Sequence, residues 1–160
     1  MGYFRPEEGN FDTGAARIAI VAARWNADIT DSLLAGALRA LARHGLEGKA
    51  VDVYRVPGAF ELPIASQRAA KTERYSAVIA LGCVIRGDTP HFDYVCAETT
   101  RGIGEVSLHH NIPVAFGLLT TDNHEQALAR AEDNADNKGE EAALSILELL
   151  TVFNHMDGEW

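Results

Sequence analysis

The sequence predicts an α/β fold in which helices cover both faces of a parallel sheet, and two observations support this. Four short apolar runs are rich in Val and Ile, which is typical of strands buried on both faces. They lie at residues 16–23, 51–56, 77–85 and 113–120. A stretch with helical periodicity follows each run. This alternation predicts parallel strands joined by crossover helices.

The first helix is predicted from one apolar stripe that ends before Gly45, a residue type that favours helix termination. The stripe consists of Ile29, Leu33, Leu34, Ala37, Leu38 and Leu41. Further helices are predicted at residues 62–71, 90–110, 125–131 and 138–153. We therefore expect a three-layer α/β/α sandwich around a central four-stranded parallel sheet, flavodoxin-like in kind. Residues 1–15 form an N-terminal arm, free to add a strand elsewhere, and residues 16–160 form a single domain.

The composition is that of a globular domain with one core, since 47% of the 160 residues are hydrophobic and 23% are charged. A formal net charge of −9 disfavours nucleic-acid binding. No apolar run approaches the roughly 20 residues of a membrane helix, and residues 1–14 lack the pattern of a signal peptide. Cys83 and Cys96 have no partner at CxxC or zinc-site spacing, which favours two buried thiols in a reducing compartment. We expect a cytoplasmic protein without a membrane partner.

Polar and aromatic residues cluster directly after each predicted strand. The clusters are Arg24-Trp25-Asn26 and residues 57–61, 86–92 and 120–123. In open parallel sheets, ligands bind outside the carboxyl ends of the strands, so these clusters mark the expected site. Because the protein is acidic overall, an anionic substrate would need positive charge gathered locally.

The cluster after the third strand has the features of an anion site. Thr89 is a natural N-cap, Pro90 suits the first turn of a helix, and Gly87 allows a ligand to approach the backbone. Free amides at a helix N-terminus bind phosphate well, and His91 beside them suits proton transfer near neutral pH. Alternatively, Thr89 and Pro90 merely start a helix and His91 is a surface residue. The cluster alone leaves both interpretations open.

The other clusters are also ambiguous when taken singly. Trp25 is either a core side chain or a flat wall for a planar heterocycle. Glu61 either accepts an N–H from a ligand or simply favours the start of the next helix. Arg130 and Lys138 flank a polar stretch, either as solvated charges or as anion ligands. The histidines form no metal-binding spacing, and no GxSxG or P-loop motif is present, so metallohydrolase, serine-hydrolase and nucleotide-binding functions have little support.

Together the clusters closely resemble the motifs of the lumazine synthase family. In the family's order and spacing they are Arg24-Trp25-Asn26, Val56-Pro57-Gly58-Ala59-Phe60-Glu61, Val84-Ile85-Arg86-Gly87-x-Thr89-x-His91-Phe92-Asp93-Tyr94-Val95, Gly117-x-Leu119-Thr120-Thr121 and Asn137-Lys138-Gly139. The resemblance covers residues 16–153, and the third motif is quite specific.

The resemblance implies 6,7-dimethyl-8-ribityllumazine synthase activity, a transferase step that is the penultimate one of riboflavin biosynthesis. The family condenses 5-amino-6-(D-ribitylamino)uracil with 3,4-dihydroxy-2-butanone 4-phosphate, releasing phosphate and water, with no metal or organic cofactor. The resemblance also implies a homopentamer with active sites between adjacent subunits. Such pentamers either remain free or assemble into an icosahedral shell, and riboflavin synthase is a further candidate partner.

Site residues are also implied by the resemblance. Those expected to hold the ribitylaminouracil are Trp25, Ala59, Phe60, Glu61, Cys83, Val84, Ile85 and Phe116. Those expected to hold the butanone phosphate are Gly87, Asp88, Thr89, Arg130 and Lys138. His91 would transfer protons. Phe116, Arg130 and Lys138 would come from the neighbouring subunit.

Two departures and two rival functions accompany this interpretation. Asp88 places a carboxylate beside the expected phosphate site, which requires the backbone to make the contact. Residues 132–136 lack the glycines of many shell-forming relatives. The first rival is a non-catalytic lumazine- or flavin-binding paralogue, which intact His91, Arg130 and Lys138 disfavour. The second is a flavodoxin-like signalling domain, which would need an acidic cluster where the chain has Arg24 and Trp25.

Overall fold

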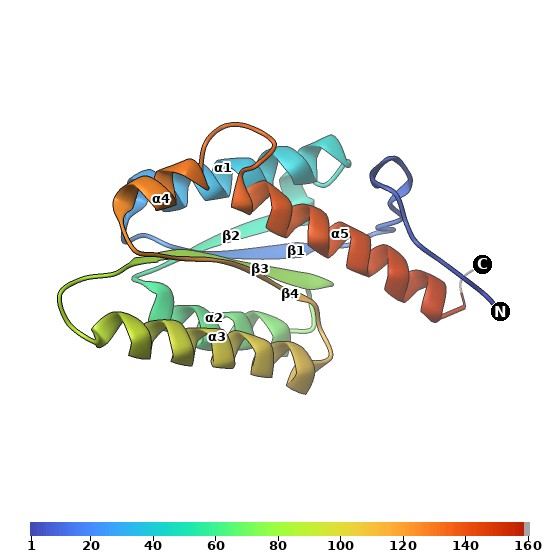
Figure 1. The fold of residues 1–160 in the computed structure, drawn as a ribbon. Helices are drawn as coiled ribbons and strands as arrows, with labels where there is room; N and C mark the ends of the chain where they lie inside the picture. The colour runs from blue at the N-terminus through green and yellow to red at the C-terminus, as the bar shows by residue number, and fades with distance from the viewer. Residues whose placement is uncertain (159–160) are drawn as a thin grey trace.

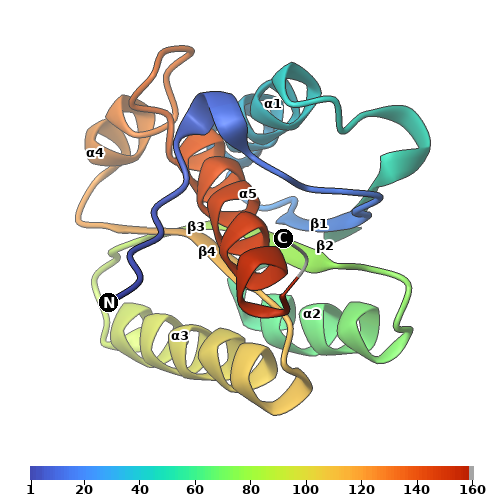
Figure 2. The ribbon, with the colours of Figure 1, turned by 90° about the vertical axis from the view of Figure 1, so that its right-hand side faces the viewer.

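A computed structural model describes residues 1–158 as one four-stranded parallel sheet between two layers of helices (Figure 1). The strands are β1 (Ile18–Ala23), β2 (Val51–Val56), β3 (Ala77–Ile85) and β4 (Val114–Thr121). Their order in the sheet is β2-β1-β3-β4, and each neighbouring pair is parallel. Helices α1, α4 and α5 cover one face, while α2 and α3 cover the other (Figures 1 and 2). The predicted three-layer sandwich is confirmed.

The five α-helices of residues 1–158 also match the predicted ones, with small shifts at their ends. They are α1 (Ala27–Arg43), α2 (Leu62–Lys71), α3 (His91–His110), α4 (His124–Ala129) and α5 (Lys138–Met156). Short 3-10 turns occur at Glu8–Asn10, Gly48–Ala50 and Ala59–Glu61. None of these helices has the length and hydropathy required to span a membrane.

Two details of the helix predictions were wrong. Pro90 precedes α3 as its capping residue instead of lying in its first turn, and the Thr89 hydroxyl accepts from the amide of His91 at 3.4 Å. In α1, Leu38 is 37% exposed, whereas Gly36 and Ala40 are buried. The buried face of α1 is therefore rotated toward small residues, which allows α5 to pack closely against it.

The core lies on both faces of the two central strands, which explains why their sequences are continuously apolar. All six residues of β1 are buried, as are the first seven of β3. On one face, Ile20 and Ile79 pack with side chains of α1 and α5; on the other, Val21 and Val78 pack with α2 and α3. Strand β2 is an edge strand whose Tyr54 is 41% exposed, so the expectation that it is covered on both faces was wrong.

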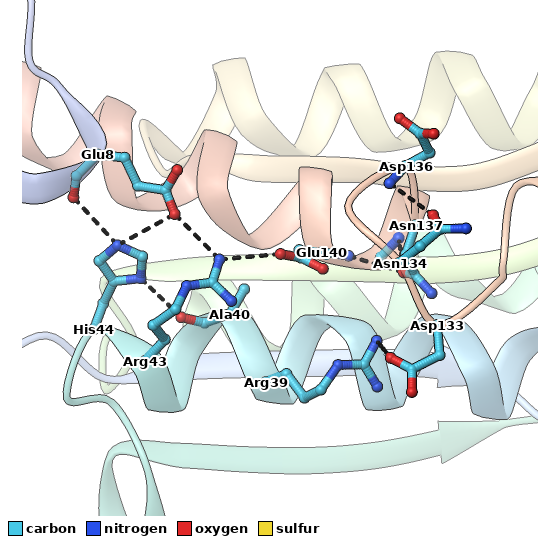
Figure 3. A network of polar contacts seen from close by, with 11 residues as sticks. Glu8, Arg39, Ala40, Arg43, His44, Asp133, Asn134, Asp136, Asn137 and Glu140 are labelled. Carbon is cyan, nitrogen blue, oxygen red and sulfur yellow. Dashed lines mark hydrogen bonds and ion pairs between the residues drawn. The ribbon is translucent and has the colours of Figure 1, made fainter.

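The N-terminal arm lies against α1 and α5 and joins none of the four strands within the described residues. The Glu8 carboxylate pairs with Arg43 at 3.1 Å, and Arg43 pairs in turn with Glu140 of α5 at 3.0 Å (Figure 3). Near the other end of α5, the Phe4 ring stacks on that of His155 with centroids 3.8 Å apart. The arm is thus held along the helical layer.

Candidate active site

A cavity of about 550 Å³ opens at the carboxyl ends of β1 and β3 and is called here the strand-end cavity. Its lining comprises Ala23, Trp25, Asn26, Gly58, Ala59, Phe60, Cys83, Val84, Ile85, His91, Tyr94, Val95 and Glu98. Seven of the residues proposed from the sequence are among them. In Figure 1 the strands end on the left, where β3 leads into α3. The cavity therefore lies where parallel sheets bind ligands.

Backbone hydrogen bonds beyond the strand ends fix the position of Trp25. The amide of Arg24 donates to the Val56 carbonyl at 2.8 Å, and that of Trp25 donates to the Pro57 carbonyl at 3.0 Å. The indole lies directly over Gly58, where a Cβ would come within 2.3 Å of the ring. Trp25 is 57% exposed, so it forms a wall of the cavity and is not a core residue.

Asn26 connects the ends of β1 and β3. Its side-chain amide donates to the Cys83 carbonyl at 3.0 Å, and its backbone is left-handed with φ 57°. Asn tolerates this conformation better than most residues. The first residue after Trp25 thus turns the chain sharply into α1 while holding the two central strand ends together.

The loop after β2 is closed by its own glutamate. The Glu61 carboxylate accepts from the amide of Gly58 at 3.0 Å, and the Glu61 amide donates to the Gly58 carbonyl at 3.3 Å. This reciprocal capping holds Ala59 and Phe60 at the cavity. Ala59 is buried, whereas the Phe60 ring is 63% exposed. Glu61 orients the loop and does not itself line the cavity.

Cys83 contributes to the cavity as an apolar side chain. Burial raises the pKa of its thiol to about 11, so the thiol stays protonated at neutral pH. Burial also raises the pKa of Cys96, which is half-buried on α3. Neither cysteine has the low pKa of a catalytic nucleophile.

One face of α3 forms the opposite wall of the strand-end cavity. His91, Tyr94, Val95 and Glu98 follow the spacing i, i+3, i+4 and i+7, which places them on a single helical face. The His91 ring is exposed and has no protein partner among residues 1–158. It is therefore free to exchange a proton with a ligand in the cavity.

The loop between β3 and α3 presents unused amides next to His91. Within the described chain, the amides of Gly87, Asp88 and Thr89 donate to no protein acceptor. A Cβ built on Gly87 would meet nothing within 4 Å, so the space beside it is open. These amides precede the N-terminus of α3, a geometry that suits an anion.

Arg86 anchors this loop. Its guanidinium donates to Asp122 at 2.9 Å and to Asp93 at 3.3 Å, and it lies 4.3 Å from the centroid of the Phe92 ring. The hydrogen bond to Asp122 raises the pKa of Arg86. Because two carboxylates neutralise it, Arg86 holds the loop to β4 and α3 rather than offering a free charge.

A second cavity of about 410 Å³ lies between the outer edge of β4 and the start of α5 and is called here the edge cavity. It is lined by residues 115–121 of β4 together with Arg130, Lys138, Glu141, Ala142 and Ser145. The Phe116 ring at its rim is 49% exposed. All three residues that the sequence assigned to a neighbouring subunit are here.

The cations of the edge cavity differ in their pairing. Lys138 forms an ion pair with Glu141 at 2.7 Å. Arg130 donates to the Gln126 carbonyl at 3.0 Å and has no carboxylate partner among residues 1–158. In a protein with a net charge of −9, this guanidinium is a local positive charge that no carboxylate of the described residues neutralises.

No residue lines both cavities, so one chain does not bring all the predicted site residues together. The strand-end cavity gathers the predicted aromatic and apolar residues together with His91, with the Gly87–Thr89 amides in the adjoining loop. The edge cavity holds Phe116 and the two cations. Among residues 1–158, no group of three or more His, Cys, Asp or Glu side chains could hold a metal ion.

Several lining residues were not predicted from the sequence, although each lies on the same helical face as a residue that was predicted. Tyr94, Val95 and Glu98 follow from His91 on α3; Glu141, Ala142 and Ser145 follow at the same spacing from Lys138 on α5. Asn26 lay within a quoted motif, but no local signal indicated its bond to the third strand.

Comparison with known proteins agrees with this arrangement. Residues 15–154 match the family model described as 6,7-dimethyl-8-ribityllumazine synthase. A protein of that name from Nitratidesulfovibrio vulgaris is 51% identical over 156 residues, which cover 98% of this chain and 100% of the relative. Another from Desulfovibrio desulfuricans is 50% identical over 148 residues, covering 92% of this chain and 95% of the relative. The chain therefore belongs to the 6,7-dimethyl-8-ribityllumazine synthase family.

Proposed function

We propose that the protein condenses 5-amino-6-(D-ribitylamino)uracil with 3,4-dihydroxy-2-butanone 4-phosphate to form 6,7-dimethyl-8-ribityllumazine. The observation that carries this proposal is the match over residues 15–154, with relatives of that name about half identical over nearly the whole chain. The reaction releases phosphate and water and belongs to riboflavin biosynthesis.

The strand-end cavity suits the ribitylaminouracil. The exposed face of Trp25 can stack on a planar pyrimidine, and the apolar lining of Cys83, Val84 and Ile85 accommodates its edge. Backbone groups around Ala59 and Phe60, which Glu61 keeps in place, can pair with the ring and the ribityl chain. We assign these residues to recognition of the uracil substrate.

The phosphate of the second substrate requires donors without competing partners. The unused amides of Gly87, Asp88 and Thr89 supply such donors beside His91. The Asp88 side chain would repel phosphate, so its role is limited to its amide. Arg130 and Lys138 would add positive charge, and Phe116 would close the site, once the edge cavity of a second subunit faces the strand-end cavity of the first.

The reaction then follows from holding both substrates together. An amine of the uracil attacks the ketone, and water leaves to give a Schiff base. A proton is lost from carbon as phosphate is eliminated, and the second amine closes the ring with loss of water. His91 would move protons in these steps, and proximity would supply much of the rate.

A ring of subunits assembled head to tail would complete the site, because a heterologous interface places one face of each subunit against a different face of the next. The separation of the predicted residues into two cavities supports this assembly. We propose a homopentamer. The mass of the native particle would show whether the pentamers remain free or assemble into an icosahedral shell.

The function is tested with the purified protein and both substrates. Formation of the fluorescent lumazine should accompany release of one inorganic phosphate per product, and sedimentation should give the mass of the particle. Absence of turnover, together with tightly bound lumazine or flavin, would show a non-catalytic binding protein instead.

A further inference from the structure

Asn137 has no exposed surface and uses its side chain fully, although it lies between two surface-facing cations. Its amide nitrogen shares its two hydrogens among the carbonyls of Ser32, Ala131 and Glu132, at 3.2, 3.1 and 3.0 Å. Its side-chain oxygen accepts from the amides of Gly139 and Glu140 at 2.9 and 3.0 Å. One side chain thus joins α1, the turn after α4 and the N-terminus of α5. Figure 3 shows Asn137 beside Glu140 in the first turn of α5.

The segment that Asn137 holds is flanked by the two cations of the edge cavity. Arg130 lies directly before it and Lys138 directly after it, and the amide of Lys138 donates to the Arg130 carbonyl at 2.9 Å. The intervening residues 131–137 form a closed loop. Asn137 binds carbonyls at the loop's start while capping the helix at its end. The relative position of the two cations therefore depends on this side chain.

Close packing against α1 leaves Asn137 little freedom. A Cβ built on Gly36 would come within 2.2 Å of its side-chain oxygen, and one built on Gly139 would come within 1.9 Å of the Leu33 carbonyl. The absence of side chains at these two glycines allows α1, Asn137 and α5 to pack directly against one another. Such packing transmits position accurately, because protein interiors yield little.

We propose that Asn137 is a positioning residue for phosphate recognition, which acts by holding Arg130 and Lys138 at a fixed separation in the edge cavity. This inference rests on the proposed function, since it assigns the two cations to the phosphorylated substrate. A misplacement of about 1 Å at a binding group can cost as much as removing the group. Asn137 touches no substrate and acts only through the two cations.

If Asn137 had only a structural role, replacing it would lower stability without affecting one substrate more than the other. The test therefore compares the KM values of the two substrates. Asn137→Ser keeps an oxygen that can cap α5 but loses the side-chain amide and its contacts with the three carbonyls. We expect the KM for the butanone phosphate to rise about tenfold, while the KM for the ribitylaminouracil stays within about twofold. Thr151→Val is the matched control, because Thr151 is buried near the other end of α5 and bonds the N-terminal arm. It should lower the melting temperature without changing either KM.

A double-mutant cycle shows whether Asn137 acts through Arg130. In an Arg130→Ala background, Asn137→Ser should raise the KM for the butanone phosphate by less than in the wild-type background, about threefold instead of tenfold, because one of the two cations it positions is gone and only Lys138 remains. Equal effects of Asn137→Ser in both backgrounds would overturn the proposal, as would an unchanged KM in the single variant.

Gly36→Ala provides a second variant, since it displaces the Asn137 amide from α1 and leaves the loop sequence intact. Binding of inorganic phosphate by calorimetry gives a readout independent of turnover. Weaker phosphate binding in both variants, with the control unchanged, supports the proposal; wild-type phosphate affinity in both overturns it. If the wild-type protein binds phosphate but makes no lumazine, the proposed function fails and the positioning role stands.

Discussion

The strand-end cavity and the edge cavity are built on different supports. The first is attached to β1 and β3, the most deeply buried strands, and hydrogen bonds beyond the strand ends hold its tryptophan and asparagine. The second is carried by the edge strand β4, the first turns of α5 and a loop fixed by one buried asparagine. The cavity with an apolar lining thus has a rigid frame from the sheet, while the cationic cavity depends on a few polar contacts.

The arginines at the two cavities also differ in their acidic partners. Beside the strand-end cavity, Arg86 is paired with Asp93 and Asp122 and serves to hold a loop. In the edge cavity, Arg130 has no carboxylate partner within the described chain. An arginine can therefore be assigned to structure or to ligand binding only when its acidic neighbours are known.

The largest effect should come from filling the strand-end cavity. Ala59→Arg places a long charged side chain at a buried lining position and should leave the enzyme nearly inactive. At a butanone phosphate concentration well below the KM of Arg130→Ala, where that variant also has little activity, co-refolding the two variants in equal amounts should raise activity above either parent. With random mixing, about a quarter of the head-to-tail interfaces pair an unaltered cavity with an unaltered Arg130. Mixed oligomers without recovery would place both halves of the site in one chain.

Replacing His91 should affect the chemical step. We expect His91→Ala to lower kcat by about a hundredfold, since a positioned acid–base group contributes at least that much in most enzymes. Binding of the ribitylaminouracil, measured by calorimetry, should be nearly unchanged. A folded variant with wild-type turnover would show that His91 is only a surface residue at the start of α3 and transfers no proton.

Removing the unpaired charge of the edge cavity should affect one substrate. Arg130→Ala should raise the KM for the butanone phosphate by about thirtyfold, the value of a lost charge-assisted hydrogen bond of about 2 kcal/mol. The KM for the uracil should stay constant. Lys49→Ala is the control, because it removes one exposed positive charge that lies outside both cavities. Weaker uracil binding in Arg130→Ala would contradict the assignment.

The smallest effect concerns the apolar lining of the strand-end cavity. Burial disfavours the Cys83 thiolate and raises its pKa to about 11, so alkylation should be slow at neutral pH and should accelerate as the pH rises. Peptide mapping by mass spectrometry after timed iodoacetamide treatment gives the rate at each pH. An inflection at or below pH 9 would show that the cavity is wet and polar around this residue.

The sequence was sufficient to predict the layers of the fold because the central strands are apolar on both faces and the helices are amphipathic. It failed at β2, where Val53 and Tyr54 are exposed: a short apolar run has the same appearance in an edge strand as in a central one. It also misplaced Leu38, because the small residues Gly36 and Ala40 that are buried instead carry no hydrophobic signal.

Site prediction was limited by contacts between residues far apart in the chain. The proposed site residues line the two cavities or lie in the loops beside them, yet their division between cavities was expected only from the family resemblance. The positioning role proposed for Asn137 could not be predicted from the sequence. Its helix-capping oxygen follows from local sequence, but the bond to Ser32 spans 105 residues and depends on a glycine in α1.

The stacking of Phe4 on His155 brings the N-terminal arm back to the last turn of α5. Both ends of the described chain lie away from the carboxyl ends of the strands (Figure 1). Because the two ends lie apart across this side of the molecule (Figure 2), a linker long enough to span that side could join them without crossing the strand-end cavity. The chain could then be opened between Gly48 and Lys49, which are exposed in a turn before β2. Such a circular permutant would keep every strand-end loop uncut, so the order of the polypeptide could be changed while the chemistry is retained.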